Sequence, residues 1–281
     1  MNRQPNFDPD VASSARIWDY LRCGKDHLEI DRDIADQMLM LAPDARTVAW
    51  FVQAFQRQTT RSAVDAGIAQ FIDLGPGIPP DRSETVAAIA RAVIPSARVA
   101  YIDNDPVPVV HYDAWHANKP GLTALQADIR DPHGLIEALK ADETIDFTEP
   151  IALSALNVLD YVLDEEDPAA VLAAFREVMA PGSRLTITHS SITSDPDLIA
   201  RYHADTVNTP AQAVFRSSAE IATLTAGFDL TSPGLVPVQQ LLGDDLPVTR
   251  MVVLGAEYTL AAGKSTPTQS SSRQCTPANA A

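Results

Sequence analysis

The chain has 281 residues, of which 46% are hydrophobic and 21% charged, proportions typical of soluble globular proteins. Its formal net charge of -16 and pI of about 4.6 argue against a nucleic-acid backbone or an anionic membrane as the main partner. The two cysteines, Cys23 and Cys275, lie far apart and form no CxxC or Cys/His array, so neither a disulfide framework nor a metal site is predicted.

The first residues, MNRQPNFDPD, are polar and lack the apolar core of a signal peptide. No stretch approaches the roughly 18 uninterrupted apolar residues of a transmembrane helix. These features predict a cytoplasmic protein without a membrane span.

Helical patterns follow a loose arm over residues 1–12. Apolar residues recur at helical spacing over residues 13–40, and Gly24 divides this stretch into two predicted helices. A third helix is predicted over residues 46–66. We therefore expect a helical arm or lid over residues 1–66.

From residue 67 onward, short apolar runs alternate with helical patterns. Such an alternation implies a parallel sheet covered by helices on both faces. Strands are predicted at 71–73, 99–103, 122–127, 151–156 and 184–188, and helices at 83–93, 105–118, 134–140 and 168–179.

The last part of the chain varies this theme. An extra helix is predicted over residues 196–207, and the capping box Ser217-Ser-Ala-Glu220 begins another that ends at Gly227. Two further strands, at 228–236 and 251–258, are joined by a polar loop without a crossover helix, so they must pair in antiparallel fashion. The domain is expected to end at residue 262, and the Ser/Thr/Pro-rich residues 263–281 are predicted to be disordered.

The first predicted strand ends in QFIDLGPGIP, which contains Asp73, Gly75, Pro76 and Gly77. Two glycines one residue apart at the end of a strand let a ligand lie against bare backbone amides. The loop lacks the lysine of a phosphate-binding P-loop and the third glycine of a dinucleotide fingerprint. Adjacent prolines also remove amide donors that a pyrophosphate needs. The loop thus favours an adenosyl ligand without a diphosphate, of which S-adenosylmethionine is one.

Acidic residues follow the next two strands. Asp103 ends the second strand, where a carboxylate can accept hydrogen bonds from both ribose hydroxyls, and Asp128 follows the third, within reach of an adenine edge. Other roles stay open: Asp73 can cap the amides of its own loop, Asp103 can cap the following helix, and Asp128 can be an ordinary loop residue.

The sequence resembles a bacterial S-adenosyl methyltransferase family formerly catalogued as a domain of unknown function. The resemblance covers about residues 10–260 and implies a Rossmann-like class I methyltransferase fold, a seven-stranded, mostly parallel sheet in the order 3-2-1-4-5-7-6 with an antiparallel last strand. It rests on ARIWDYL at 15–21 with GKD at 24–26, FIDLGPGIP at 71–79, YIDNDP at 101–106, QADIRDP at 126–132, PGS at 181–183, AEI at 219–221, GF at 227–228 and PGLVP at 233–237.

The resemblance implies S-adenosyl-L-methionine as the cofactor. The residues expected to bind it are Asp73, Gly75, Pro76, Gly77, Asp103, Asn104, Asp128, Ile129, Leu156 and Lys25. Lys25 with Asp26 is expected to fold over the cofactor as part of a lid, although the two can equally form a solvated surface pair.

Departures from the family pattern concern the acceptor side more than the cofactor loop. They include Cys23 and His27, the run at 46–50, Asp160 where the family usually has a histidine after strand four, and the run at 239–241. They motivate an alternative in which the fold binds S-adenosylmethionine or another adenosyl ligand in a regulatory role, without turnover.

Methyl transfer requires no protein nucleophile, because the cofactor carries the reactive group and the protein mainly aligns the acceptor. A base is needed only where the acceptor must lose a proton. The candidates are His189, Asp160 and Tyr20, with a purely structural histidine as the alternative for His189. The sequence therefore predicts a methyltransferase acting on a small-molecule acceptor, and it leaves the acceptor and the oligomeric state open.

Overall fold

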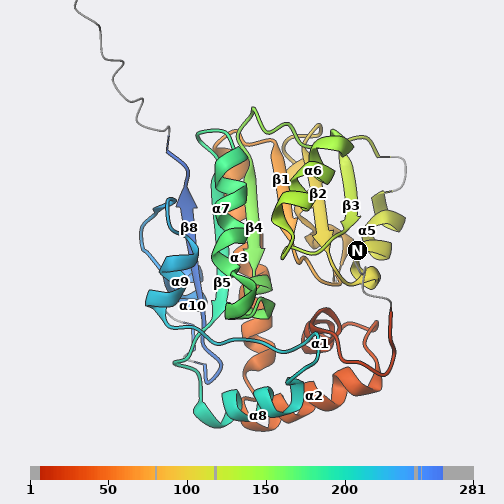
Figure 1. The fold of residues 1–281 in the computed structure, drawn as a ribbon, viewed down its shortest axis with the longest axis vertical. Coiled ribbons are helices and arrows are strands. Elements are labelled where there is room, and N and C mark those ends of the chain that lie inside the picture. The colour runs from red at the N-terminus through yellow and green to blue at the C-terminus, as the bar shows by residue number, and fades with distance from the viewer. Residues whose placement is uncertain (1–6, 80, 117–118, 244–245, 248, 262–281) are drawn as a thin grey trace, which may run out of the picture.

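A single mixed sheet forms the centre of the computed structural model, which describes residues 7–79, 81–116, 119–243, 246–247 and 249–261 (Figure 1). The strands run in the order β3-β2-β1-β4-β5-β8-β6, and β7 also pairs with β8. The first five are parallel, and β8 is antiparallel to each of its neighbours. Their bounds are β1 Gln70–Leu74, β2 Arg98–Asp103, β3 Leu122–Gln126, β4 Ala152–Leu156, β5 Arg184–Ser190, β6 Asp229–Leu230, β7 Val236–Pro237 and β8 Val253–Thr259. The predicted fold class and strand order are confirmed.

Strand order reverses beside β1. The chain builds β2 and β3 outward on one side of β1, and then returns to place β4 and β5 on the other side. The register aligns Leu74 at the end of β1 with Ile102 in β2 and Ala155 in β4, so the carboxyl ends of these strands meet at one edge of the sheet. In open α/β sheets this reversal point is where ligands bind.

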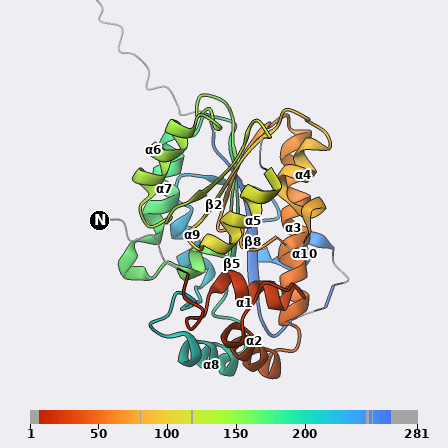
Figure 2. The ribbon, with the colours of Figure 1, turned by 90° about the vertical axis from the view of Figure 1, so that its right-hand side faces the viewer.

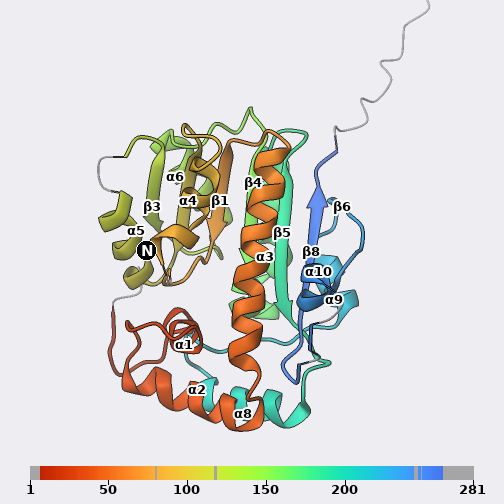
Figure 3. The ribbon, with the colours of Figure 1, turned by 180° about the vertical axis from the view of Figure 1, so that it is seen from behind.

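Helices cover both faces of the sheet, as its continuous apolar strands require (Figure 2). One face carries α3 (Ala45–Asp65), α4 (Val86–Arg91), α5 (Pro106–His116) and α10 (Val238–Leu242). The other carries α6 (Pro132–Asp142), α7 (Pro168–Val178) and α9 (Ser218–Leu224). The long helix α3 runs along the sheet beside β4 and β5 (Figure 3).

Three helices gather at the carboxyl edge of the parallel strands. They are α1 (Ser14–Leu21), α2 (Glu29–Leu41) and α8 (Pro196–Thr206), and α2 packs between the other two (Figure 1). Ile17, Leu21, Ala35 and Tyr202 share one apolar cluster with Phe55 of α3. The first two helices therefore form a roof over this edge of the sheet. Among the helices of the described ranges, none has the length and apolar character needed to cross a bilayer.

The late strands differ from the prediction. Instead of one strand over residues 228–236, the structure has the two short strands β6 and β7, separated by a turn in which Gly234 takes a φ of +103° and Pro233 has no amide hydrogen for the ladder. This split explains why eight strands form where seven were predicted. The predicted polar loop after β7 contains α10, while the predicted disordered tail at 263–281 lies outside the described residues.

One helix start also differs. A 3-10 turn occupies Arg82–Glu84, and α4 begins at Val86 because the Thr85 hydroxyl accepts a hydrogen bond from the Ala88 amide. The division between a lid at 1–66 and a domain at 67–262 stays a prediction, since α3 lies within the proposed lid yet packs on the sheet.

Asp31 links the two roof helices, α1 and α2, to each other. Its buried carboxylate accepts hydrogen bonds from the amides of Ser13 (2.9 Å) and Leu28 (2.9 Å) and from the Arg16 guanidinium (2.7 Å). One side chain thus joins the start of α1, the start of α2 and the turn between them.

Replacing Asp31 with Ala should lower the free energy of unfolding by about 3–5 kcal/mol, because the buried Arg16 charge loses its partner. Urea unfolding followed by circular dichroism measures this. Asp33→Ala, on the exposed side of the same helix, is the matched control and should stay within about 0.5 kcal/mol of the wild type. Equal losses in the two variants would contradict the role given to Asp31.

Candidate functional site

A cavity of about 250 Å³ opens at the carboxyl edge of the parallel strands. Its walls come from the ends of β1, β2, β3 and β4, from the roof helix α1, from α3 and from residues 209–212 after α8. The cavity therefore lies at the point where strand order reverses, the position that the sequence predicted for a ligand.

The loop after β1 is bare backbone at this point. Gly75 and Gly77 have φ angles of +61° and +62°, which only glycine adopts readily, and Pro76 lies between them. A Cβ atom on Gly75 would lie 2.3 Å from Cγ2 of Val158, a residue of the segment that follows β4. The absence of a side chain at Gly75 therefore allows the loops after β1 and β4 to touch.

Asp103 holds the same loop from the neighbouring strand. Its carboxylate accepts hydrogen bonds from the amides of Gly77 (3.1 Å) and Asp105 (2.9 Å). Burial, together with the charges of Asp105 and Asp73, raises its pKa to about 7 against the opposing effect of these two amides. Each oxygen keeps a free lone pair, so the carboxylate can still accept bonds from a ligand.

Asp73 is the second buried carboxyl of the cavity wall. It accepts hydrogen bonds from the Ser154 hydroxyl (2.5 Å) and the Gln56 amide (3.0 Å), both side chains of neighbouring elements rather than amides of its own loop. Burial raises its pKa to about 7, although these two hydrogen bonds act in the opposite direction. Two buried carboxyls with pKa values of about 7 thus face the cavity, and a cation bound there would favour their ionised forms.

The remaining predicted cofactor residues divide into two groups. Asn104, Asp128, Ile129 and Leu156 line the cavity, whereas Lys25 is exposed and does not belong to its lining. Asp128 is paired with Arg130 through N–O distances of 2.9 and 2.6 Å, and Arg130 also reaches Glu166. Burial alone would raise the pKa of Asp128, but the Arg130 hydrogen bonds and charge lower it.

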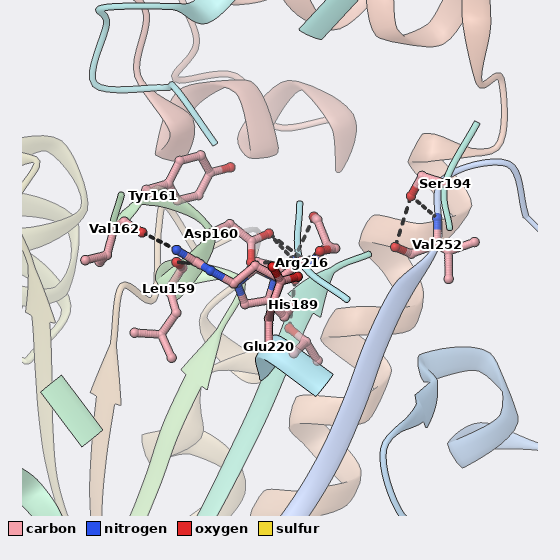
Figure 4. A network of polar contacts seen from close by, with 12 residues as sticks. Leu159, Asp160, Tyr161, Val162, His189, Ser194, Arg216, Glu220 and Val252 are labelled. Carbon is pink, nitrogen blue, oxygen red and sulfur yellow. Dashed lines mark hydrogen bonds and ion pairs between the residues drawn. The ribbon is translucent and has the colours of Figure 1, made fainter. Parts of the chain in front are cut away.

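The structure does not bring the predicted base candidates to the cavity. The Tyr20 hydroxyl donates to Asp36 (2.8 Å), and both His189 and Asp160 are 1% exposed; none of the three belongs to the cavity lining. Nε2 of His189 lies 2.9 Å from the Arg216 guanidinium (Figure 4). Because a guanidinium only donates, Nε2 accepts this hydrogen bond, and its lone pair is not free to take a proton from an acceptor.

The sequence reasoning missed several wall residues. Trp18 in α1 donates its indole N–H to the Tyr161 hydroxyl (2.8 Å), which joins the roof to the segment after β4. Helix α3 presents Ala49, Val52, Gln53 and Gln56 to the cavity, at the i, i+3, i+4, i+7 spacing of one helix face. Two glutamines within that otherwise apolar stripe were the available signal, while the Trp18–Tyr161 pair, 143 residues apart, had none.

The cavity has two chemically different halves. Around the ends of β1 to β3 it presents carboxylates and backbone amides, with Asp73 and Asp103 at the centre. Toward α1, α3 and the 209–212 loop it mixes apolar and polar side chains. The apolar ones are Trp18, Ala49, Val52, Leu156, Tyr161 and Pro210, and the polar ones include Arg16, Gln53, Gln56, Thr209 and Gln212.

Comparison with known proteins identifies a family model and similar solved structures that each cover most of the chain. The family model described as S-adenosyl methyltransferase matches residues 1–262. The chain is similar to a DUF574-family protein from Streptomyces avermitilis MA-4680, with 28% identity, a TM-score of 0.82 and coverage of 90% of this chain and 99% of that one. It is also similar to a protein from Thermobifida fusca YX, with 29% identity, a TM-score of 0.81 and coverage of 90% and 97%. Among curated proteins, none matches the sequence.

The raised pKa of Asp73 predicts a pH-dependent stability. Its value is 3.8 in an unperturbed chain and about 7 here, so the folded protein retains a proton that the unfolded chain releases. Stability from this group is therefore full below pH 4 and is lost as the pH rises toward 7, by at most about 4 kcal/mol. Asp73→Asn does not ionise, and should gain stability relative to the wild type across that interval.

Urea unfolding at pH 4.5 and pH 8 measures this difference. The exposed Asp65→Asn variant, at the end of α3, is the control and should show the same offset from the wild type at both pH values. An offset for Asp73→Asn that does not change with pH would mean that Asp73 is ionised in the folded protein across this range.

Proposed function

Because the chain belongs to the S-adenosyl methyltransferase family, we propose that its cavity binds S-adenosylmethionine beside a small organic acceptor. The protein is an S-adenosylmethionine-dependent methyltransferase. The observation that carries the proposed location is the glycine loop of Gly75 and Gly77 between two buried carboxyls, Asp73 and Asp103.

The residues of the loop fit this cofactor. S-adenosylmethionine carries a sulfonium and an ammonium group, and the buried carboxyls of Asp73 and Asp103 are the groups of the cavity wall that such cations would favour in the ionised form. We assign the ribose hydroxyls to Asp103 and the amino-acid part to the loop at Gly75, Pro76 and Gly77.

The adenine side of the proposed site lies at the ends of β2 and β3. Asn104, Asp128 and Ile129 line this end of the cavity. Arg130 donates to both oxygens of Asp128 through its backbone amide and its guanidinium, so the adenine is expected to pack mainly on the apolar surface of Ile129 beside this ion pair. Leu156 lies on the opposite wall, at the end of β4.

The second half of the cavity supports a small acceptor with an apolar part. The polar atoms of Trp18 and Tyr161 are bonded to each other, so their rings offer apolar surface, and Ala49, Val52 and Pro210 add to it. The net charge of -16 disfavours a polyanionic acceptor such as nucleic acid. We propose a cytoplasmic enzyme with a small-molecule acceptor.

Bound S-adenosylmethionine supplies an electrophilic methyl group for in-line displacement. The chain contributes alignment of the acceptor by apolar walls and exclusion of water by the roof helices. His189, Asp160 and Tyr20 lie away from the cavity, so proximity and desolvation, rather than a base drawn from these three, are the contributions that the geometry supports.

The first test is isothermal titration with S-adenosylmethionine, S-adenosylhomocysteine and NAD. We expect the two adenosyl ligands to bind and NAD not to bind, and Asp103→Ala to weaken binding of both by tenfold or more, since about 1.4 kcal/mol of ribose contacts is lost. Normal binding by Asp103→Ala would place the site elsewhere.

Turnover separates an enzyme from a protein that only binds the cofactor. Formation of S-adenosylhomocysteine, followed with a panel of small aromatic and aliphatic amines, phenols and thiols, should appear with at least one neutral compound. Tight cofactor binding without turnover on any small compound, but with turnover on a protein or nucleic acid, would contradict the small-molecule acceptor.

Replacing Gly75 with Ala should abolish most cofactor binding. The new methyl group would meet Val158 at a φ of +61°, so overpacking of about 1–3 kcal/mol adds to the backbone strain in the folded protein. Because the loops after β1 and β4 must then move apart, we expect the Kd to rise by about tenfold or more. Gly67→Ala is the matched control, because Gly67 also has a positive φ, +85°, but no atom lies within 4 Å of its added Cβ. The control should lose about 1 kcal/mol of stability and bind S-adenosylhomocysteine normally. Equal affinities in the two variants would show that the Gly75–Val158 contact is not needed.

A further inference from the structure

A buried polar network lies directly behind the cavity wall, outside the proposed chemistry. Its centre is formed by Asp160, which follows β4, His189 near the end of β5, and Arg216, which precedes α9 (Figure 4). The three residues are no more than 3% exposed, and none of them lines the cavity. Burying charged groups destabilises a protein unless they are paired and hydrogen-bonded, and these three groups bond to one another and to the backbone.

Arg216 is bonded to both ends of one short segment. Its guanidinium donates to the carbonyl oxygens of Leu159 (3.0 Å) and Val162 (2.8 Å), and to the carboxylate of Asp164 (2.7 Å). The same guanidinium reaches Nε2 of His189 at 2.9 Å. A planar group with five donors in fixed directions can hold several acceptors at once, which a lysine cannot do.

Asp160 ties the segment to β5 from the other side. Its carboxylate accepts from the side-chain amide of Asn157 (2.9 Å) and from the Ser190 backbone amide (3.2 Å), and it lies 3.0 Å from Nδ1 of His189. Since Nε2 of His189 accepts from Arg216, the ring carries its proton on Nδ1, which faces Asp160 Oδ1 and the Ser190 carbonyl oxygen (2.9 Å). His189 therefore bridges Arg216 and Asp160.

The segment held in this way is also part of the cavity. Asn157, Val158, Tyr161, Val162 and Leu163 all line it. Val158 is the residue that occupies the space left free by Gly75, and the Tyr161 hydroxyl accepts the hydrogen bond from Trp18 in the roof. A displacement of the segment would thus reach both the cofactor loop and the roof.

We propose that Arg216, His189 and Asp160 are positioning residues that fix the wall segment 157–163 against the cofactor loop and the roof. They set the shape of the cavity from behind and have no contact with the reacting atoms. The proposal rests on the proposed function only in its choice of S-adenosylhomocysteine as the probe.

The local readout is the indole N–H resonance of Trp18 in a ¹H–¹⁵N spectrum, assigned by its loss in Trp18→Phe. Because this N–H bonds to Tyr161, its chemical shift reports the position of the wall segment without any ligand. In His189→Leu, which removes the contacts of the ring with Arg216, Asp160 and the Ser190 carbonyl, we expect this resonance to move or broaden and the Kd for S-adenosylhomocysteine to rise tenfold or more. His189→Gln keeps an acceptor for Arg216 and should recover most of the affinity.

Arg216 provides a second, independent variant. Arg216→Lys keeps the charge but not the planar set of donors, so it should weaken S-adenosylhomocysteine binding nearly as much as Arg216→Met. The matched control is Arg176→Met, because Arg176 also donates to a backbone carbonyl, that of Ala226, yet joins α7 to the turn after α9, outside the cavity lining. The control should change thermal stability while leaving both the Trp18 resonance and the Kd unchanged.

The outcomes are distinct. If folded His189→Leu and Arg216→Lys keep the wild-type Kd and Trp18 resonance, the network only stabilises the fold and the proposal is wrong. The proposal is equally wrong if the control Arg176→Met changes the Kd and the Trp18 resonance as much as these two variants do. If the wild type itself fails to bind S-adenosylhomocysteine, the proposed function is wrong, while the Trp18 resonance still decides whether the network positions the wall. Should the leucine variant not fold, His189→Gln and Arg216→Lys provide the same two readouts.

Discussion

The contact between Gly75 and Val158 is the constraint on which the site depends. It brings together the loops that follow β1 and β4. These two strands are neighbours at the point where strand order reverses, with β2 and β3 on one side and β5 on the other. Any Cβ at Gly75 would separate them, and the positive φ of this residue selects glycine as well. Once these loops touch, the ends of the strands form one continuous wall, and the roof helices can close a cavity over it instead of an open groove.

Closing the site buries two carboxyl groups, and their ionised forms are destabilised by the loss of water. Asp73 and Asp103 are 2% and 7% exposed, and burial is the main cause of their raised pKa values. Hydrogen bonds from Ser154, Gln56 and two backbone amides offset part of the desolvation but leave the pKa of both groups at about 7. A cationic ligand in the cavity would complete the compensation, so the same groups that weaken the empty protein at neutral pH favour a cationic ligand.

The sequence predicted features whose cause is local. Periodicity revealed the strands and most helices, and the glycine pair after β1 with Asp103 after β2 predicted the site, because parallel strands end at a common edge. His189 and Asp160 also follow strands, and on that ground were expected near the ligand. Position along a strand does not determine which way a side chain points, however. Arg216, 27 residues further along the chain, donates a hydrogen bond to the His189 ring and so occupies its Nε2. Partners brought together by tertiary structure, such as Trp18 and Tyr161, leave no periodic signal in either segment.

The wall segment 157–163 is therefore held from two opposite sides. From the roof, Trp18 bonds to Tyr161; from the interior, Arg216 bonds to the carbonyl groups of Leu159 and Val162. The groups involved come from the first helix and from the residue stretch before α9, nearly 200 residues later, and neither needs to touch a ligand to define the cavity. These bonds add to the burial of Leu159 and Val162 in the core. A short segment can serve as the wall of a binding site only when its neighbours remove its freedom, because an unconstrained loop would lose entropy each time a ligand bound. The proposal thus gives Asp160 a role in how the wall is held, which is compatible with methyl-transfer chemistry that takes place on the other side of that wall.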